Sequence, residues 1–259
     1  MTKKKDLERR DFLKLAATAG AAVASLKVVP DVLASGPKGS SPHSWAMVID
    51  QNKCEGCGAC TLACRAHNDI HPDISWNRVL PDCEVDGIQM YLPRPCMQCE
   101  DAPCVGVCPV KASYYRPDGI VMMDYDKCIG CRYCEVACPY NARAFNWETF
   151  AGPNPAVPDW GQPEVERRPR GVVEKCSFCY NRIDRGLALG LIPGVDKAAT
   201  PACVNACPMG ARIFGDLNDP ESEVSKIVHT KVTHQLRKDL GPGPRGYYIR
   251  PHDAEEVVS

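Results

Sequence analysis

The chain has 259 residues, a formal net charge of −1 at pH 7 and 24% charged residues. This near-neutral balance argues against a general role in binding nucleic acid or an anionic membrane surface. Aromatic residues make up only 7% of the chain, which is low for a conventional apolar core, whereas cysteine occurs 17 times.

The first 34 residues are typical of a targeting peptide. Arg9 and Arg10 form a twin-arginine pair, an Ala-rich apolar stretch covers residues 15–29, and residues 32–34 offer a cleavage site. The alternatives are an ordinary amphipathic helix or a short membrane anchor. The pair resembles the signal of the pathway that exports folded proteins, so we expect a periplasmic location, with cofactors inserted before the chain leaves the reducing cytoplasm.

Sixteen of the seventeen cysteines fall into four sets of four. Three thiolates in one tight loop, followed by a fourth cysteine three residues later, is the ligand spacing of bacterial iron–sulfur ferredoxins. The loop can wrap three corners of a cubane cluster, and the fourth corner needs a ligand from elsewhere. The sets are Cys54, Cys57, Cys60, Cys64; Cys96, Cys99, Cys104, Cys108; Cys128, Cys131, Cys134, Cys138; and Cys176, Cys179, Cys203, Cys207.

The last cysteine of each set has a separate role in this interpretation. In two-cluster ferredoxins the fourth cysteine, usually followed by proline, ligates the other cluster. Proline follows Cys108, Cys138 and Cys207, whereas Arg65 follows Cys64. We therefore expect the fourth cysteines to be exchanged between sets.

Other uses of the cysteines are less favoured. A zinc ribbon needs two separated CxxC pairs, but two of these sets place three thiols within seven residues. A disulfide framework is the usual interpretation of an exported cysteine-rich chain, although cysteines separated by two residues are commonly metal or redox positions. Covalent haem is excluded because no CxxC is followed by histidine.

An internal repeat organises the chain. Residues 48–57 align with residues 122–131, each a predicted short strand running into a cysteine loop. Residues 102–109 match residues 200–208 in the order Pro, Cys-x3-Cys-Pro. Duplication of a ferredoxin-like unit is the simplest account.

Connection lengths indicate which sets share a unit. Residues 109–127, between sets two and three, form the shortest of the three connections, and short connections usually join neighbours. Set two then pairs with set three, and set one with set four; sequential pairing is the alternative. The predicted clusters are Cys54, Cys57, Cys60 with Cys207; Cys176, Cys179, Cys203 with Cys64; Cys96, Cys99, Cys104 with Cys138; and Cys128, Cys131, Cys134 with Cys108.

The motifs carry a family resemblance from about Trp45 to Asp219. The order of the four sets, the Cys-Pro-x-x-Ala-Arg sequences at 138–143 and 207–212, and residues 170–179 resemble the four-cluster iron–sulfur subunits of the dimethyl sulfoxide reductase and polysulfide reductase superfamily. The resemblance supports crossed pairing and implies a linear relay of four [4Fe-4S] clusters. Some relatives hold a three-iron cluster where tryptophan replaces a cysteine; all sixteen positions here are cysteine.

The resemblance also implies partners. An export signal on the iron–sulfur subunit is similar to the exported subunits of tetrathionate reductase, nitrite-reduction complexes and the Dsr complex of sulfur metabolism, and residues 215–220 resemble the Dsr type most. We expect an integral membrane quinone-binding subunit, a cytochrome or molybdenum catalytic subunit, and no nucleic acid. The alternatives are the iron–sulfur subunit of a molybdenum-containing reductase and an exported stand-alone polyferredoxin.

The expected mechanism is outer-sphere electron transfer, and the sequence shows no substrate site of its own. The fold class is expected to be α+β, with duplicated bacterial ferredoxin-like domains and long loop insertions. The expected organisation is a signal peptide at 1–34; a double ferredoxin-like domain at 45–219, with an inner unit at about 90–146 and an outer unit at 45–70 plus 172–219; and a partner-docking helix and tail at 220–259.

Two segments and the loop residues carry further predictions. The proline-rich stretch 147–171 should be an extended loop, and residues 221–240 have helical spacing followed by a short strand at 247–249. Both are candidates for partner contacts, with packing on the cluster core as the alternative. Small apolar loop residues are expected to exclude water: Val105, Val107, Ile129, Val136 and Ala137.

Isolated side chains give weaker signals. Lys53 and Lys127 precede first cysteines and could raise cluster potentials, or could be solvated loop lysines. His67 and His71 have helical metal-site spacing, but we expect surface loop histidines because no further ligand motif is near. Cys83 lies outside the four sets and is expected to be a buried small apolar residue.

Overall fold

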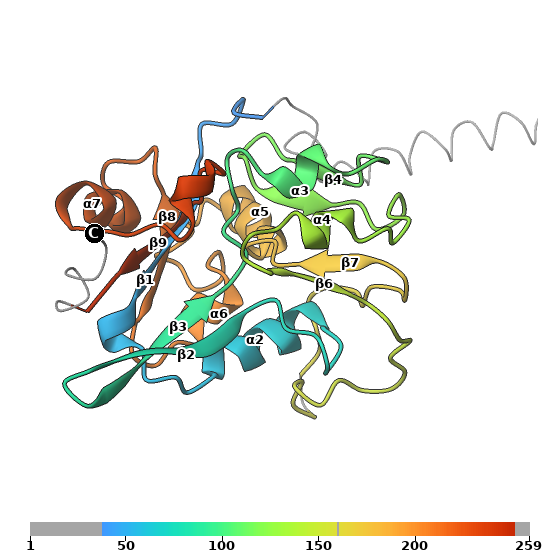
Figure 1. Cartoon of the computed structure of the whole chain (residues 1–259), viewed down its shortest axis with the longest axis horizontal. Helices are drawn as coiled ribbons and strands as arrows, with labels where there is room; N and C mark the ends of the chain where they lie inside the picture. Colours follow the sequence, from blue (N-terminus) through green and yellow to red (C-terminus); the bar gives the residue numbers. More distant parts are fainter. Residues whose placement is uncertain (1–37, 160, 252–259) are drawn as a thin grey trace, which may run out of the picture.

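The computed structural model describes residues 38–159 and 161–251, which form small sheets and short helices around one main core (Figure 1). The expected targeting segment, residues 1–34, lies outside the described residues. The mixed helix and strand content agrees with the α+β class. No helix in the described part of the chain is both long and apolar enough to cross a membrane.

A three-stranded sheet joins distant parts of the chain. Strand β1 (Trp45–Asp50) pairs antiparallel with β8 (Arg212–Asp216) and parallel with β9 (Gly246–Ile249). All six residues of β1 are buried, because alternate side chains point to opposite faces and both faces are covered. Trp45, Met47 and Ile49 enter the main core, while the other face packs against α7.

Three two-stranded sheets complete the strands of the described residues. A hairpin joins β2 (Arg78–Val85) to β3 (Ile88–Arg94), and a second joins β4 (Ser113–Tyr115) to β5 (Val121–Met123). Strand β6 (Arg143–Phe145), which follows the third cysteine set, pairs with β7 (Val173–Lys175), which precedes the fourth set. The β6–β7 pair therefore ties the predicted inner unit to the predicted outer unit.

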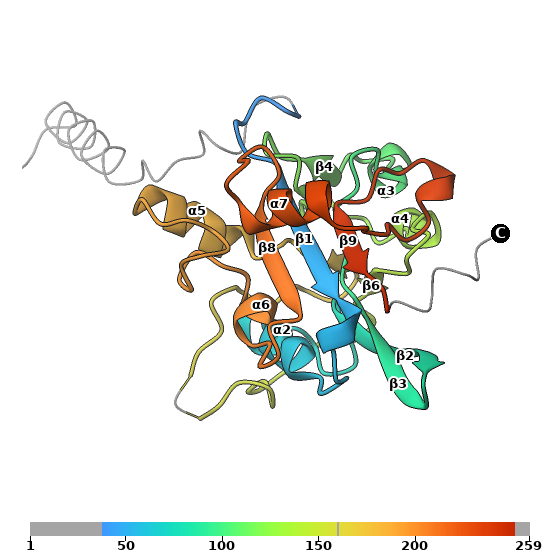
Figure 2. The same cartoon turned by 90° about the vertical axis from the view of Figure 1, so that its left-hand side faces the viewer.

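The helices are short and pack in two pairs beside the cysteine loops. Helix α2 contacts α6, so the first set meets the fourth, and α3 contacts α4, so the second set meets the third. Figure 2 shows α2 and α6 lying together. The helices are α2 (Ala59–Asn68), α3 (Pro103–Gly106), α4 (Tyr133–Val136), α5 (Tyr180–Ala188), α6 (Ala202–Asn205), α7 (Glu223–Thr230) and the 3₁₀ turns η2 (Gln51–Lys53) and η3 (Lys238–Leu240).

The C-terminal segment is built into the fold. Val224 and Ile227 of α7 pack on Ala46 and Val48 of β1, as the predicted helical spacing requires, but the helix ends at Thr230 and does not continue to residue 240. In β9, Tyr248 is fully buried and its hydroxyl donates a hydrogen bond to the carbonyl oxygen of Pro93 at 2.9 Å. The segment up to residue 251 thus contributes to the core, while its role in docking a partner stays a prediction.

The expectation that Cys83 is buried is wrong. Cys83 lies in strand β2 of the hairpin that projects from the body in each view (Figures 1 and 2) and is exposed. Residues Pro81–Glu84 are all exposed because only β3 covers this part of the strand. The hairpin tip lacks the second layer that would bury a small apolar side chain.

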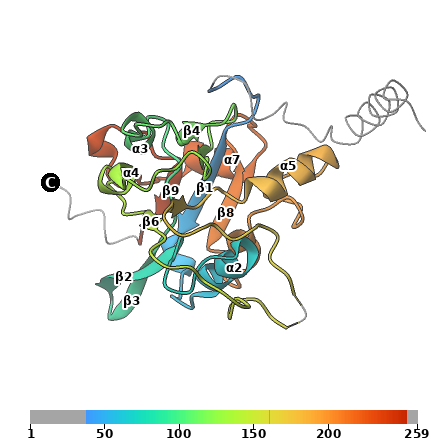
Figure 3. The same cartoon turned by 90° about the vertical axis from the view of Figure 1, so that its right-hand side faces the viewer.

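The proline-rich stretch 147–171 contains no helix or strand among its described residues, which exclude residue 160. It passes beside the C-terminal end of α2 (Figure 3) and is fixed there by buried polar groups. Arg167 forms an ion pair with Asp69 at 2.9 Å, and Arg168 pairs with Glu174 at 3.2 Å. The loop is therefore anchored on the protein's own core over part of its length.

Glu174 connects this loop to the core. Its carboxylate accepts hydrogen bonds from Trp76 Nε1 at 3.1 Å, Arg168 Nη2 at 3.2 Å and Asn146 Nδ2 at 3.3 Å. The side chains of Arg168 and Glu174 are 3% and 1% exposed. A pair this deeply buried is costly to break, because the remaining partner keeps an uncompensated charge.

Glu174→Gln should lower the free energy of unfolding by about 3–5 kcal/mol, because it leaves the Arg168 guanidinium without its carboxylate. Anaerobic denaturant titration measures the loss. Glu221→Gln is the matched control, since Glu221 pairs with Lys226 at 2.8 Å on the surface and should change stability by less than about 1 kcal/mol. Equal losses in the two variants would contradict the anchoring role of Glu174.

Candidate metal centres

All four cysteine sets begin with the same backbone turn. The residue before the second cysteine has a positive φ in each set: 72° at Gly56, 47° at Gln98, 70° at Gly130 and 54° at Phe178. This left-handed residue turns the chain sharply between two cysteines three positions apart, which lets both thiols face the same space. Sequence reasoning missed the two non-glycine turns, since only the glycines gave a signal.

Gln98 shows how a non-glycine residue is held in this turn. Its side chain is fully buried, accepts a hydrogen bond from Val121 N at 2.9 Å and donates one to the carbonyl oxygen of Cys176 at 2.7 Å. These bonds join the second cysteine loop to strand β5 and to the fourth loop. They offset the cost of a left-handed conformation, which is about 1–2 kcal/mol.

Two of the cysteine groups each line a cavity. Cys64 lines one cavity with Cys203 on α6 and with Cys176 and Cys179 in the loop before α5, and Cys207 lines the other with the first set. The first-set and fourth-set cysteines are therefore exchanged between two sites. We name them quartet A (Cys54, Cys57, Cys60, Cys207) and quartet B (Cys64, Cys176, Cys179, Cys203).

Cys138 of the third set lies with the cysteines of the second set. Burial raises the pKa of Cys99 to about 12, and the neighbouring thiols of Cys96, Cys104 and Cys138 add to the rise. Cys128 lies near Cys134, while Cys108 follows α3, which packs against α4. We name quartet C (Cys96, Cys99, Cys104, Cys138) and, with Cys108 and Cys131 added to Cys128 and Cys134 as the cysteine spacing predicts, quartet D (Cys108, Cys128, Cys131, Cys134).

The quartets follow one another in space. Burial is the main cause of the raised pKa of Cys203 in quartet B, and Cys60 of quartet A is close enough to raise that pKa further. Cys96 of quartet C acts in the same way on Cys176 of quartet B, whose pKa burial raises to about 12. Cys104 of quartet C likewise acts on the buried Cys134 of quartet D. The order is therefore A, B, C, D.

Only the end quartets reach the surface. Cys57 in quartet A and Cys131 in quartet D are exposed, whereas the thiols of quartet B are buried and those of quartet C are buried apart from the half-buried Cys138. The expectation that Ile129 and Val136 exclude water is wrong, because these side chains are 64% and 84% exposed. Val107 is exposed as well, while Val105 and Ala137 are half-buried.

Hydrogen-bond donors surround the thiols. Backbone N–H groups donate to sulfur from Ala211 to Cys207 at 3.3 Å, from Ser113 to Cys108 at 3.5 Å and from Phe178 to Cys176 at 3.4 Å. The Arg143 guanidinium donates to Cys104 Sγ at 3.1 Å. Each donor favours a negatively charged sulfur ligand over a neutral thiol.

The other candidate residues take structural or surface positions. His67 is buried, contrary to the expected surface position, because the loop covers it: its ring lies 3.3 Å from Glu164 Oε1 and 3.4 Å from Asn181 Oδ1. Lys53 and Lys127 are more than half exposed and lie near Asp50 and Asp124, as solvated loop lysines do.

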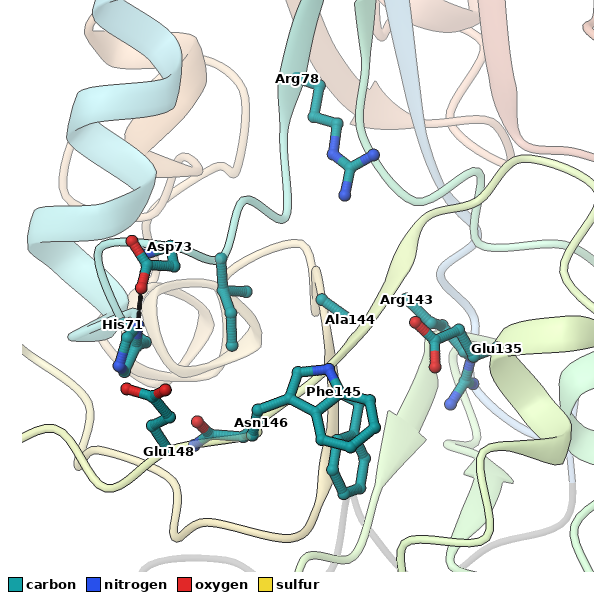
Figure 4. Close-up of a pocket in the computed structure, with 11 residues that line it drawn as sticks. His71, Asp73, Arg78, Glu135, Arg143, Ala144, Phe145, Asn146 and Glu148 are labelled. Carbon is teal, nitrogen blue, oxygen red and sulfur yellow. Dashed lines mark hydrogen bonds and ion pairs between the residues drawn. The ribbon is translucent and has the colours of Figure 1, made fainter.

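A separate pocket of about 420 Å³ lies between the end of α2 and strand β6 (Figure 4). His71, Asp73, Arg78, Glu135 and Glu148 lie around it, with Phe145 and Trp147, and no cysteine lines it. The His71 Nδ1 atom lies 3.8 Å from Asp73 Oδ2. Sequence reasoning gave no signal for this pocket.

Comparisons with known proteins agree with the cysteine geometry. Models of the "4Fe-4S dicluster domain" match residues 88–152 and 127–211, and a "4Fe-4S binding domain" matches residues 45–66. The chain is 46% identical over 222 residues to a "Putative dimethyl sulfoxide reductase iron-sulfur subunit" of Halobacterium salinarum, and the match covers 80% of this chain and 79% of the relative. It belongs to this family of iron–sulfur subunits.

Two other relatives extend the match. The "Menaquinone reductase, iron-sulfur cluster-binding subunit" of Nitratidesulfovibrio vulgaris is 42% identical over 229 residues, covering 79% of this chain and 88% of the relative. The "Hdr-like menaquinol oxidoreductase iron-sulfur subunit 1" of Archaeoglobus fulgidus is 38% identical over 277 residues, covering 94% and 98%. The predicted membership of the superfamily is confirmed.

The quartets fit several [4Fe-4S] clusters, and their number matches four. All seventeen cysteines are free thiols, which contradicts a disulfide framework. In the described part of the chain, no three His, Cys, Asp or Glu side chains are placed to hold a single metal ion. Buried donors without a partner, Asn77 Nδ2 and Arg143 Nε, lie on residues beside quartets B and C and suit a group rich in acceptors.

Gly130→Ala should destabilise the chain by about 2 kcal/mol or more, because φ is +70° there and the added Cβ would lie 2.3 Å from the carbonyl oxygen of Gly171. Anaerobic thermal unfolding measures the change. Gly106→Ala is the control, since no atom lies within 4 Å of its Cβ position and alanine favours its helix. A harmless Gly130→Ala would refute the requirement for this turn.

Proposed function

We propose that this protein relays electrons through four [4Fe-4S] clusters, one on each quartet, between a membrane quinone-interacting subunit and a redox partner. The observation that supports this proposal is the continuous order of the quartets, from the exposed Cys57 of quartet A, through the buried quartets B and C, to the exposed Cys131 of quartet D. The two exposed thiols give an electron one point of entry and one of exit. The clusters supply reversible one-electron oxidation and reduction.

The chain's own residues hold and shield the sites. Each quartet takes ligands from two distant segments, so the packed helix pairs α2–α6 and α3–α4 fix the thiols relative to one another. Backbone N–H groups and Arg143 favour charged sulfur, and the buried walls of quartets B and C exclude water. Hydrogen bonds to sulfur and solvent exclusion are the means by which a protein sets cluster potential.

The proposed partners rest on the relatives' names. Two of the three relatives described above are named for menaquinone or menaquinol, which supports a quinone-binding membrane partner. The third is named for dimethyl sulfoxide, a sulfur compound, which supports a place in respiratory sulfur metabolism. The twin-arginine pair at residues 9 and 10 supports export to the periplasm.

Equivalent turns in the two halves support the proposed duplication. The third residue after each Cys-Pro cysteine is left-handed, with φ of 55° at Lys111, 48° at Asn141 and 60° at Gly210. A buried arginine follows two residues after Asn141 and after Gly210, at positions 143 and 212. These matches are expected if the two units descend from one ferredoxin-like ancestor.

A double substitution tests the ligand assignment. Cys57→Ser combined with Cys207→Ser should remove about four of about sixteen irons, because both thiols serve one cluster. Sequential pairing places them in different clusters and predicts a loss of about eight. Iron and sulfide analysis of anaerobically purified protein distinguishes the two, with Cys83→Ser as the control that loses none. Fewer than about eight irons in the unaltered protein would defeat the four-cluster proposal.

A charge-preserving substitution tests export. Arg9→Lys with Arg10→Lys should leave the protein in the cytoplasm, because the twin-arginine pair is the address that the export route reads. Cell fractionation with immunoblotting measures the distribution. Lys4→Arg with Lys5→Arg changes neighbouring residues and should leave export intact. Equal periplasmic amounts of both variants would refute the proposed route.

A further inference from the structure

Two arginines are buried at equivalent positions without an acidic partner. Arg143 is 2% exposed and Arg212 is 4% exposed, and each is the sixth residue of a Cys-Pro-x-x-Ala-Arg sequence. Neither takes part in any of the arginine ion pairs among the described residues. Burying an unpaired charge costs several kcal/mol, and arginine keeps its proton in proteins. Another negative group must balance each guanidinium.

Two sulfur atoms and one hydroxyl group contact the Arg143 guanidinium. Its Nη2 atom donates to Cys104 Sγ of quartet C at 3.1 Å and to Ser113 Oγ at 2.7 Å, while Nη1 lies 2.9 Å from Met123 Sδ. Burial raises the pKa of Cys134 in quartet D, and the nearby charge of Arg143 opposes that rise. Arg143 therefore lies between quartets C and D.

Arg212 has the corresponding place between quartets A and B. It lines the cavity of quartet A, and its Nη1 atom reaches Cys203 Sγ of quartet B at 3.8 Å. Its Nη2 atom donates to Asn77 Oδ1 at 2.6 Å. Asn77 in turn lines the cavity of quartet B. The guanidinium thus borders both sites of the pair.

We propose that Arg143 and Arg212 are fixed counter-charges, each shared by the two clusters of one pair, that raise the reduction potentials of both clusters together. A cluster with four thiolate ligands is negatively charged and becomes more so on reduction, so a nearby cation favours the reduced form. Because the cation is shared, an electron stays beside it when it moves within the pair. This inference rests on the proposed assignment of clusters to the quartets.

Redox titration of the full chain, followed by electron paramagnetic resonance, tests the proposal. Arg143→Gln should lower the potentials of two of the four clusters, and Arg212→Gln should lower those of the other two. Arg143→Lys and Arg212→Lys keep the charge and should retain most of the original potentials. Lys127→Gln is the control: Lys127 is 65% exposed beside Cys128, and solvent screens its charge, so no shift is expected.

Specific results would overturn the shared role. No shift, a shift confined to one cluster, or an equal shift in all four would refute it, and so would equal shifts in the lysine and glutamine variants. If Arg212→Gln does not fold, Asn77→Asp replaces it, since this isosteric change places a carboxylate on Arg212 and should lower the potentials of pair A and B alone. If Arg143→Gln does not fold, Ser113→Asp replaces it in the same way, since Ser113 Oγ accepts from Arg143 Nη2 at 2.7 Å, and unchanged potentials of pair C and D would refute the role of Arg143. Unchanged potentials in folded Asn77→Asp would refute the role of Arg212.

Iron content separates this inference from the proposed function. If only this inference is wrong, the arginine variants keep their full iron and sulfide content and their reduction potentials do not change. Failure of the cluster assignment appears earlier, as iron far below about sixteen per chain in the unaltered protein.

Discussion

The requirement that each cofactor draws thiols from two distant segments determines the architecture. Quartets A and B exchange Cys64 and Cys207, which brings α2 against α6 and closes the sheet between β1 and β8. Quartets C and D do the same for α3 and α4. Eight ligand cysteines belong to the main core, where they take the place of the aromatic residues that the chain lacks. Under the proposed assignment of clusters, metal–ligand bonds would complete the core together with apolar packing, and cofactor binding would be coupled to folding.

Buried sulfur also explains the buried positive charges. Arg143 and Arg212 lie within the C–D and A–B pairs, and the fully buried Lys175 lies at the junction of B and C, where its ammonium group donates to the carbonyl oxygen of Cys176 at 2.6 Å. Burial lowers the pKa of Lys175, while the thiols of Cys96 and Cys176 oppose that change. A basic residue therefore occupies every interval in the series of quartets. In an apolar core these side chains would be strongly destabilising.

The sequence was most informative where chemistry restricts the chain most. Cysteine spacing and connection lengths predicted quartets A, B and C, whose thiols the structure brings together, because ligand number and loop reach leave few arrangements. Positions without such a restriction were harder to predict. The exposure of Cys83 depends on how far a hairpin projects, and the burial of His67 depends on a distant loop that covers it. The turns at Gln98 and Phe178 gave no sequence signal, because neither residue is glycine, and the turn at Gln98 is held by contacts with other loops.

The two ends of the series face a different environment from its middle. Quartets A and D contain exposed thiols, and quartets B and C do not. Each pair therefore combines one solvent-exposed site and one buried site. Solvent exposure shifts the reduction potential of a cluster, so the two sites of a pair are expected to differ in potential. A charge placed beside one site alone would change the difference between the two potentials, whereas a shared charge moves both potentials in the same direction. Arg143 and Arg212 each border one exposed and one buried quartet, so the proposed counter-charges act at the two steps where solvent exposure changes most. Because each charge is shared, the difference in reduction potential between the two clusters of a pair is set by solvent exposure.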